Sequence, residues 1–329
     1  MTRSFDAFDR DDFRSLDDPD RGTSGGSESF WSLRVRLSQL HTREESADAR
    51  DREDRDRSRQ ERPPLHREER VREILGQRVR TVFRNRDKTF ELRDSEIHAL
   101  SEVGKFRVVA QNDLAEFAYN GDRKRMEHDI ENLERQGLAE VKTIPDIEHN
   151  PIKVVTLTKE GNRFLRQGGM LEPGQRTYHG LKKPNEAAHD ADLYRLYHKV
   201  SDEIEGKGGR VVGVRLDYEL KEELYSSVAQ ASKLRHESLE SIREEMAESL
   251  HLKVVDGKIP IPDLRIEYVN ENDWQLRRND LELATDHYRP RGLSEKARAG
   301  FEVYARREDT DRLRRVRDRE ELMTTIFRM

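Results

Sequence analysis

The sequence predicts a protein of mixed α and β structure, of the α+β or α/β class, with two folded regions behind a disordered, charge-rich N-terminal segment. Three observations lead to this prediction. Residues 94–168 show helical periodicity and then two runs of alternating apolar and polar residues. Residues 183–306 mix helical patterns with buried-strand patterns. With 329 residues, the chain is long enough for two domains and tails, at roughly 150 residues per domain.

Composition limits the classes of function. Charged residues make up 39% of the chain and apolar residues 33%, whereas soluble domains average roughly 25% charged residues, so much of the chain is expected outside a core. The net charge of −5 is unfavourable for a DNA-binding protein, but a phosphate group responds to the local field rather than to the whole-chain charge. The absence of cysteine excludes disulfide and thiolate chemistry.

The segment before the folded regions is expected to lack a core. Residues 1–65 contain too little apolar surface to offset the entropy cost of ordering the chain, so we expect disorder there. Residues 66–93 are predicted as a basic helix, over 67–84, and a connector. The chain shows no apolar leader and no run of ~18 apolar residues. We therefore expect a cytoplasmic protein without a membrane partner.

Three amphipathic helices open the first folded region. Each has apolar residues three or four positions apart, which places them on one face. The turn dipeptide Asn120-Gly121 separates the second helix from the third, and Gly137 ends the third. The apolar faces consist of Ile97, Leu100 and Val103, then Leu114 and Phe117, then Met126, Ile130 and Leu133.

Two alternating segments, 138–143 and 152–157, follow these helices and are predicted to pair as a ribbon. Three helices followed by a two-stranded wing are the order of a winged helix-turn-helix. In helix-turn-helix proteins the second helix of the motif, here the third helix of the region, lies in the major groove of DNA. Residues 94–168 are therefore predicted to bind double-stranded DNA.

The outward face of the third helix is the candidate DNA contact. Its cationic residues gather near the helix N-terminus, where such helices meet bases and phosphates. Glu127 and Glu131 on the same helix oppose this role, and an ordinary solvated helix face is the alternative. The candidate DNA-binding residues are Arg123, Lys124, Arg125, His128 and Arg135 in the helix, with Lys142 and Lys153 in the wing.

Two segments of this region carry a resemblance to a known group of proteins. Residues 157–161 have the sequence Leu-Thr-Lys-Glu-Gly after a strand, and residues 129–138 form the end of the third helix and the start of the wing. Both segments resemble MarR-like winged-helix proteins, in the wing-to-helix junction and in the recognition helix. The resemblance implies the fold, and it implies neither a target sequence nor a ligand.

A Gly- and Pro-rich linker, 169–182, leads into the second folded region, 183–306. A charged helix over 307–329 is predicted to end the chain. The predicted elements of the second region are, in order, a helix over 185–204, a strand over 210–216, a charged helical insertion over 219–250, strands over 261–269 and 274–283, and a helix over 294–306.

The last strands and helix of this region carry a second resemblance. Pro262-Asp263 opens one strand, Leu281-Glu282-Leu283 closes the next, and Lys296 and Tyr304 lie in the helix that follows. These features resemble the second domain of the replication-relaxation family. Proteins of that family are associated with bacterial plasmids and mobile elements, and they carry a winged helix before a domain similar to restriction-endonuclease-like PD-(D/E)xK nucleases. The resemblance extends over about residues 94–306.

The resemblance implies a phosphodiester-cleaving site. Asp263 and Glu282, on adjacent strands, would hold Mg²⁺, and a lysine would orient water and stabilise developing charge. Ala284 stands where such nucleases have that lysine, and Lys296 on the next helix is the candidate replacement. Because one charge is missing from its usual position, the sequence favours a nuclease-like domain without catalytic activity. His189 and Asp190, in the region's first helix, either join the site or pack on that helix.

The sequence therefore predicts a DNA-binding protein of the replication-relaxation type, acting in plasmid or mobile-element replication or transfer, or in transcription control. A first alternative is a Mg²⁺-dependent endonuclease that uses Asp263, Glu282 and Lys296. The apolar stripe of the C-terminal helix is a candidate homodimer contact. A second alternative is a scaffold whose charged helices, over 67–84, 219–250 and 309–328, recruit protein partners.

Overall fold

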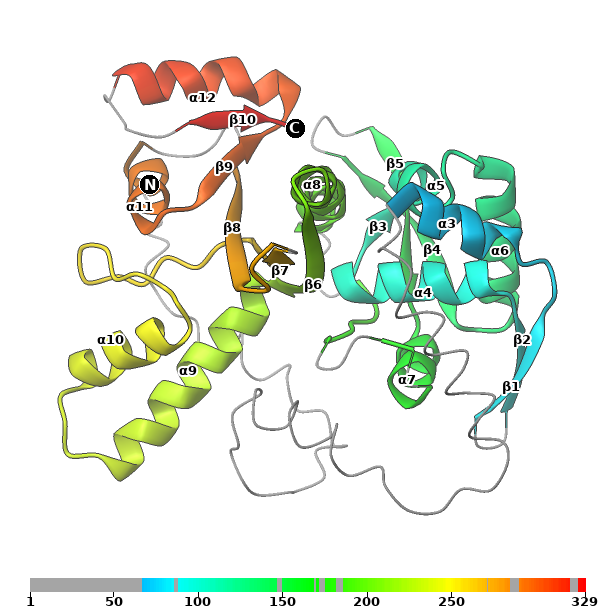
Figure 1. Ribbon diagram of the computed structural model, residues 1–329, viewed down its shortest axis with the longest axis horizontal. Coiled ribbons are helices and arrows are strands. Elements are labelled where there is room, and N and C mark those ends of the chain that lie inside the picture. Colours follow the sequence, from blue (N-terminus) through cyan, green and yellow to red (C-terminus); the bar gives the residue numbers. More distant parts are fainter. Residues whose placement is uncertain are drawn as a thin grey trace. The chain divides into compact units, whose positions relative to one another are not determined.

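The computed structural model confirms the mixed α and β class (Figure 1). It describes residues 67–85, 88–146, 150–168, 170–171, 175–181, 186–270, 272–284, 290–319 and 325–329. Within these residues it contains ten helices, α3–α12, and ten strands, β1–β10. None of these helices is both long enough and apolar enough to cross a bilayer. The predictions for residues 1–65 lie outside the described part of the chain.

The N-terminal half of the described chain contains the predicted helices and ribbon. Strands β1 and β2 form an antiparallel pair, and a separate three-stranded sheet has the order β3-β5-β4. The elements are α3 (Arg67–Gly76), β1 (Thr81–Asn85), β2 (Lys88–Leu92), α4 (Asp94–Phe106), β3 (Val109–Ala110), α5 (Gln111–Ala118), α6 (Arg123–Arg135), β4 (Ala139–Pro145), β5 (Pro151–Leu157) and α7 (Lys159–Gln167).

The helix predicted over 67–84 is wrong beyond residue 76. Helix α3 ends at Gly76, and the chain continues into strand β1. The β-branched residues of β1 favour an extended backbone. Phe83 of β1 and Phe90 of β2 pair across the two strands, and both contact the ring of Phe164 edge-on. Packing against this ring therefore favours the strands over a longer helix.

Helices α4, α5 and α6 bury their predicted apolar faces against one another. Helix α6 begins after Asp122, whose side chain accepts a hydrogen bond of 3.1 Å from the backbone N–H of Arg125. The inner face of α6 is buried in the core, so only its outward face can contact solvent or a partner. Core residues that are at most 1% exposed include Leu100, Val103, Leu114, Met126, Ile130 and Leu133.

The Leu-Thr-Lys-Glu-Gly segment fixes the junction between β5 and α7. The hydroxyl of Thr158 caps α7 by accepting from the N–H of Gly161, and it donates 2.6 Å to the carbonyl of Gly137. A Cβ atom on Gly161 would lie 1.9 Å from the carbonyl oxygen of Leu138. Only glycine allows this approach, so the motif is explained by local packing in this chain.

The C-terminal half contains a five-stranded sheet in the order β10-β9-β8-β7-β6. Strands β6, β7 and β8 are antiparallel neighbours, whereas β9 and β10 are parallel to β8. The elements are α8 (Ala187–Glu205), β6 (Gly209–Leu216), α9 (Asp217–Leu234), α10 (Leu239–Ser249), β7 (Leu264–Asn270), β8 (Leu276–Ala284), α11 (Pro290–Ala299), β9 (Glu302–Ala305), α12 (Arg307–Arg319) and β10 (Ile326–Arg328).

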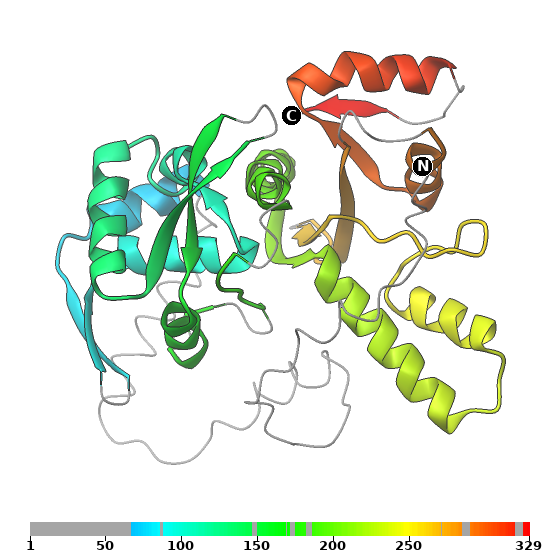
Figure 2. The ribbon, with the colours of Figure 1, turned by 180° about the vertical axis from the view of Figure 1, so that it is seen from behind.

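The charged insertion predicted over 219–250 is a helical hairpin, α9 and α10, which leaves the sheet at the end of β6 (Figure 2). An apolar cluster that includes Leu220, Leu224 and Ile242 holds the two helices together, and Leu252 and Ile261 from the segment that leads to β7 belong to the same cluster. The hairpin is therefore packed against the chain that enters the sheet.

Two predicted helices end earlier than expected. The helix predicted over 294–306 ends at Ala299, because Gly300 adopts a φ of +93° and the chain then enters strand β9. The helix predicted over 307–329 ends at residue 319, and Ile326–Arg328 form strand β10. Ile326 is 1% exposed and Phe327 stacks on Tyr304 of β9, so packing against β9 favours the strand.

Helix α8 contacts both sheets. It packs on β6 and β7 of the large sheet and on β3, α4 and α5 of the N-terminal half (Figure 1). Its Arg195 makes a two-pronged ion pair with Asp113 of α5, at 2.9 and 3.1 Å, and its His198 stacks on the ring of Phe117. One apolar cluster includes residues from both halves. Helix α8 is therefore a main contact between the two halves.

Candidate functional site

The large sheet brings Asp263 and Glu282 to adjacent strands. Leu264 of β7 pairs with Leu281 of β8 in an antiparallel register, which places Asp263 opposite Glu282. Oδ2 of Asp263 accepts a hydrogen bond of 2.9 Å from the backbone N–H of Leu283. The two predicted carboxylates are therefore neighbours across one strand pair.

Lys296 of α11 reaches the same place. Its Nζ lies 2.8 Å from Oε2 of Glu282 and also donates 2.8 Å to the carbonyl of Ile261. The side chains of Lys296 and Glu282 are 19% and 1% exposed. Removing both charges from water is costly unless they pair well, and such buried charged groups gather at functional sites. Lys296 thus brings an ammonium group from the next helix to the Glu282 carboxylate.

His189, in the first turn of α8, faces Asp263. Its Nε2 lies 3.7 Å from Oδ2 of Asp263, the distance of an ion pair rather than of a hydrogen bond. Burial alone would lower the pKa of His189, but the Asp263 carboxylate, helped by Asp190, raises it to about 9. Burial would raise the pKa of Asp263, but His189 and Lys296 lower it overall. At neutral pH the site therefore contains ionised Asp263 beside a protonated His189.

Asp190, the next residue of the same turn, contacts Arg107. Its Oδ2 lies 3.3 Å from Nη1 of Arg107, at the end of α4. Burial raises the pKa of Asp190 to about 6, and the charge of Arg107 limits the rise. The side chain of His189 therefore faces Asp263, whereas the side chain of Asp190 pairs with Arg107.

The carboxylates of Asp263 and Glu282 offer the oxygen ligands that Mg²⁺ prefers. Among the residues that the structure describes, no group of three or more His, Cys, Asp or Glu side chains is arranged to hold a metal. Mg²⁺, however, is usually held by one or two carboxylates, with water and substrate phosphates completing its shell. Asp263 and Glu282 supply such a pair, so the residues present fit this ion.

Helix α9 contributes to the site in a way that the sequence did not indicate. The backbone N–H of Asp217 donates 3.1 Å to the carbonyl of Asp263, and the Asp217 side chain holds Lys221 at 2.6 Å. Burial would lower the pKa of Lys221, but Asp217 and then Asp263 raise it. In the sequence these residues belong to a long charged run, which does not distinguish them from solvated side chains.

The outward face of α6 is a second candidate site. Nε of Arg123 lies 3.1 Å from Oε1 of Glu127, and both side chains are largely exposed. Three arginine or lysine residues on this face are matched by three glutamates, so its local field is weak. The exposed residues of α6 are Arg123, Lys124, His128 and Arg135, together with Glu127, Glu131 and Glu134.

Three other predicted DNA contacts have different surroundings. Arg125 is turned toward α3 and donates to the carbonyls of Leu75 and Gln77, the latter at 3.1 Å. Lys142 lies 3.0 Å from Glu140 on the same strand. Lys153 is exposed on β5. Arg125 is therefore engaged within the protein, whereas both wing lysines remain at the surface.

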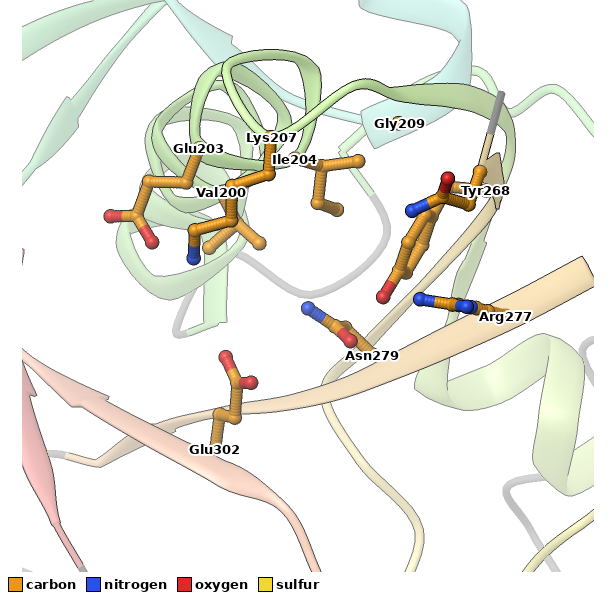
Figure 3. Close-up of a pocket in the computed structure, with 10 residues that line it drawn as sticks. Val200, Glu203, Ile204, Lys207, Gly209, Tyr268, Arg277, Asn279 and Glu302 are labelled. Carbon is orange, nitrogen blue, oxygen red and sulfur yellow. The ribbon is translucent and has the colours of Figure 1, made fainter. Parts of the chain in front are cut away.

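A small cavity of about 150 Å³ lies on the α8 side of the large sheet. Figure 3 shows Lys207, Asn279 and Glu302 extending toward the same space. It shares no residue with the Asp263–Glu282–Lys296 site. The lining residues are Val200, Glu203, Ile204, Lys207, Gly209, Tyr268, Asn270, Arg277, Asn279 and Glu302.

Comparison of the chain with models of protein families, with curated proteins and with solved structures gives no match. The functional conclusions below therefore rest on the residues and their geometry.

Proposed function

We propose that this protein binds double-stranded DNA and hydrolyses phosphodiester bonds with Mg²⁺ at the site formed by Asp263, Glu282 and Lys296. The observation that carries the proposal is the 2.8 Å contact between Lys296 Nζ and the buried Glu282 carboxylate. The sequence favoured an inactive domain because Ala284 replaces the usual lysine. That reason loses its force once an ammonium group reaches the carboxylates from α11.

The arrangement of elements supports a replication-relaxation type of organisation. Helices α4–α6 followed by the β4–β5 ribbon support a winged helix, in which α6 would enter the DNA groove. An antiparallel β6–β7–β8 meander, a helix and a parallel strand support a restriction-endonuclease-like domain. We propose a role in the replication or transfer of a plasmid or mobile element, with transcription control as the other role of such a DNA-binding protein.

Each residue of the site has a distinct task in this proposal. Mg²⁺, when bound, would stabilise charge on the phosphate and lower the pKa of a water molecule. Asp263 and Glu282 would hold the ion. Lys296 would orient the attacking water and stabilise charge that develops on the phosphate oxygens. His189, protonated at neutral pH, adds a second cation beside Asp263.

A nicking assay tests the proposal. Supercoiled plasmid is incubated with the full-length protein and Mg²⁺, and relaxed circles are measured over time. D263N and E282Q should lower the rate by more than about 100-fold, beyond the effect typical of an outer-shell residue. D256N is the matched control, because Asp256 is an exposed carboxylate whose partner is Arg298. No nicking by the wild-type protein at any Mg²⁺ concentration would contradict the proposed activity.

A DNA-binding protein without cleavage is the second candidate. The observation that favours it is that a cation already faces each carboxylate, Lys296 for Glu282 and His189 for Asp263. This candidate predicts binding of a random duplex that weakens steeply with salt, as phosphate contacts require, together with no nicking. Absence of any salt-sensitive binding would contradict both candidates and favour the scaffold alternative.

A further inference from the structure

Arg107 lies in a strained turn at the end of α4. Its φ of +66° and ψ of −50° are close to those of the rare γ-turn with positive φ, and the N–H of Val108 donates 2.6 Å to the carbonyl of Phe106 across it. The carbonyl of Arg107 accepts 2.9 Å from the hydroxyl of Thr156. A residue other than glycine in this conformation is costly, and such strain gathers at functional sites.

The side chain of Arg107, in the N-terminal half, contacts residues of the C-terminal half. Its guanidinium lies 3.3 Å from the carboxylate of Asp190 in α8. The same group lies over the ring of Tyr218 in α9, 4.0 Å from the ring centroid. The side chains of Arg107 and Asp190 are 13% and 14% exposed. A guanidinium so shielded, paired and stacked at once has one well-defined position.

Both contacts lead to the carboxylate site. His189 directly precedes Asp190 in the chain, and its Nε2 lies 3.7 Å from Oδ2 of Asp263. One ionic contact thus holds the first turn of α8 at Asp190, the residue next to the one that meets the site. Movement of that turn would change the distance between His189 and Asp263.

The second route passes through α9. Tyr218 follows Asp217, whose backbone N–H donates 3.1 Å to the carbonyl of Asp263. Arg107 therefore touches the chain neighbour of each residue that contacts Asp263 from α8 and α9. No other ion pair between the two halves among the described residues reaches both neighbours; the bidentate Arg195–Asp113 pair, for example, connects α8 only with α5.

We propose that Arg107 is a positioning residue for the carboxylate site, through which the N-terminal half holds His189 and the start of α9 in place around Asp263. The proposal rests on the proposed function and deepens it, because it makes the site dependent on the DNA-binding half of the chain. The hydrogen bond from Thr156 holds the backbone of the turn, and the contacts with Asp190 and Tyr218 hold the guanidinium.

The test compares R107K with R195K in the full-length protein. R107K keeps the charge and the backbone strain but lacks the planar group that stacks on Tyr218 and pairs with Asp190. R195K makes the same chemical change in another ion pair between the halves, away from the site. In the nicking assay R107K should lower kcat by about 10- to 100-fold, as outer-shell partners do, with KM for DNA within about twofold of wild type. R195K should leave both unchanged.

A second measurement does not depend on activity. In protein labelled with ¹³C-histidine, the ring signal of His189, assigned with H189Q, is recorded at one fixed pH. R107K should shift this signal and R195K should not. Y218L, which removes the ring on which Arg107 stacks, should reproduce the shift and serves if R107K does not fold.

The outcomes separate the two proposals. A wild-type protein that fails to nick DNA contradicts the proposed function alone, and the His189 signal then decides the role of Arg107. If R107K and Y218L leave both the His189 signal and kcat unchanged, as R195K does, Arg107 has no positioning role. An equal loss of kcat in R107K and R195K would also overturn the proposal, because it would reflect general weakening of the contact between the halves.

Discussion

The face of α6 and the Asp263–Glu282–Lys296 site contain the same kinds of charged residues in different surroundings. On α6, Arg123 and Glu127 form an ion pair with side chains 61% and 49% exposed. In the large sheet, Lys296 and Glu282 form an ion pair with side chains 19% and 1% exposed. Exposed pairs contribute roughly 0–1 kcal/mol because water screens them. Water cannot screen a buried charge that loses its partner. The Lys296–Glu282 pair is therefore the one of these two pairs that constrains the fold.

The largest expected effect is on stability at the buried pair. K296M leaves the Glu282 carboxylate buried without its cation and should lower the free energy of unfolding by about 3–5 kcal/mol. R123A on α6 should change it by less than about 1 kcal/mol. Urea denaturation measures both. Adding E282Q to K296M should restore most of the loss, because the unpaired charge is removed; equal effects of K296M and R123A would show that burial does not distinguish the pairs.

The next effect is the pH dependence of stability at His189. Its pKa rises from 6.5 in the unfolded chain to about 9 in the folded protein, so the stabilisation is complete below pH 6.5 and is lost as the pH rises to 9. The loss should be at most about 3.5 kcal/mol, at about 1.4 kcal/mol per pKa unit. Urea denaturation across this pH range measures it. H189Q should flatten this part of the curve, and an unchanged slope in H189Q would assign the effect to other groups.

A smaller effect distinguishes two neighbouring cations of α6. R125A removes the donors to the carbonyls of Leu75 and Gln77, which are partly buried and exposed, respectively, and should cost about 1 kcal/mol, the net contribution of a typical hydrogen bond. K124A, an exposed residue on the same helix, should stay within about 0.5 kcal/mol of wild type. Thermal or urea unfolding of the two variants tests this difference. Equal stability would mean that Arg125 is available to DNA after all.

The smallest expected effect concerns DNA affinity. The double variant R123A/K124A should lower duplex affinity and reduce the salt dependence of log K by about 2, one phosphate contact for each cation. Titration of a fluorescent duplex at several salt concentrations measures the slope. E127Q removes the anion that pairs with Arg123 and should strengthen binding. If neither change affects the slope, α6 does not contact phosphate.

Local patterns were sufficient for the helices of the N-terminal half and for most strands of the large sheet. The inner faces of α4–α6 follow from residues three or four apart, and the β4–β5 ribbon from alternation. Segment ends were less predictable. Residues 81–85 and 326–328 are strands because Phe83 packs edge-on against Phe164 and Phe327 stacks on Tyr304, and periodicity within a segment carries no information about such contacts.

The candidate site shows the same division. The resemblance to a nuclease-like domain led the sequence analysis to Asp263, Glu282 and Lys296, and it left open whether His189 and Asp190 join them. The sequence gave no sign that Asp190 turns to Arg107 instead, or that Arg107 contacts both Asp190 and Tyr218. The last contact joins a turn to residues 83 and 111 positions further along, a separation at which no local pattern exists.

The sequence by itself determined most of the helices and strands, the apolar face of each and the charged residues that each one carries. Only the tertiary structure decided which charges are buried together and which remain in water. The physical reason is that periodicity depends on neighbours within one or two turns, whereas burial, and with it the pKa of His189 and the cost of separating Lys296 from Glu282, depends on elements brought together by the whole fold.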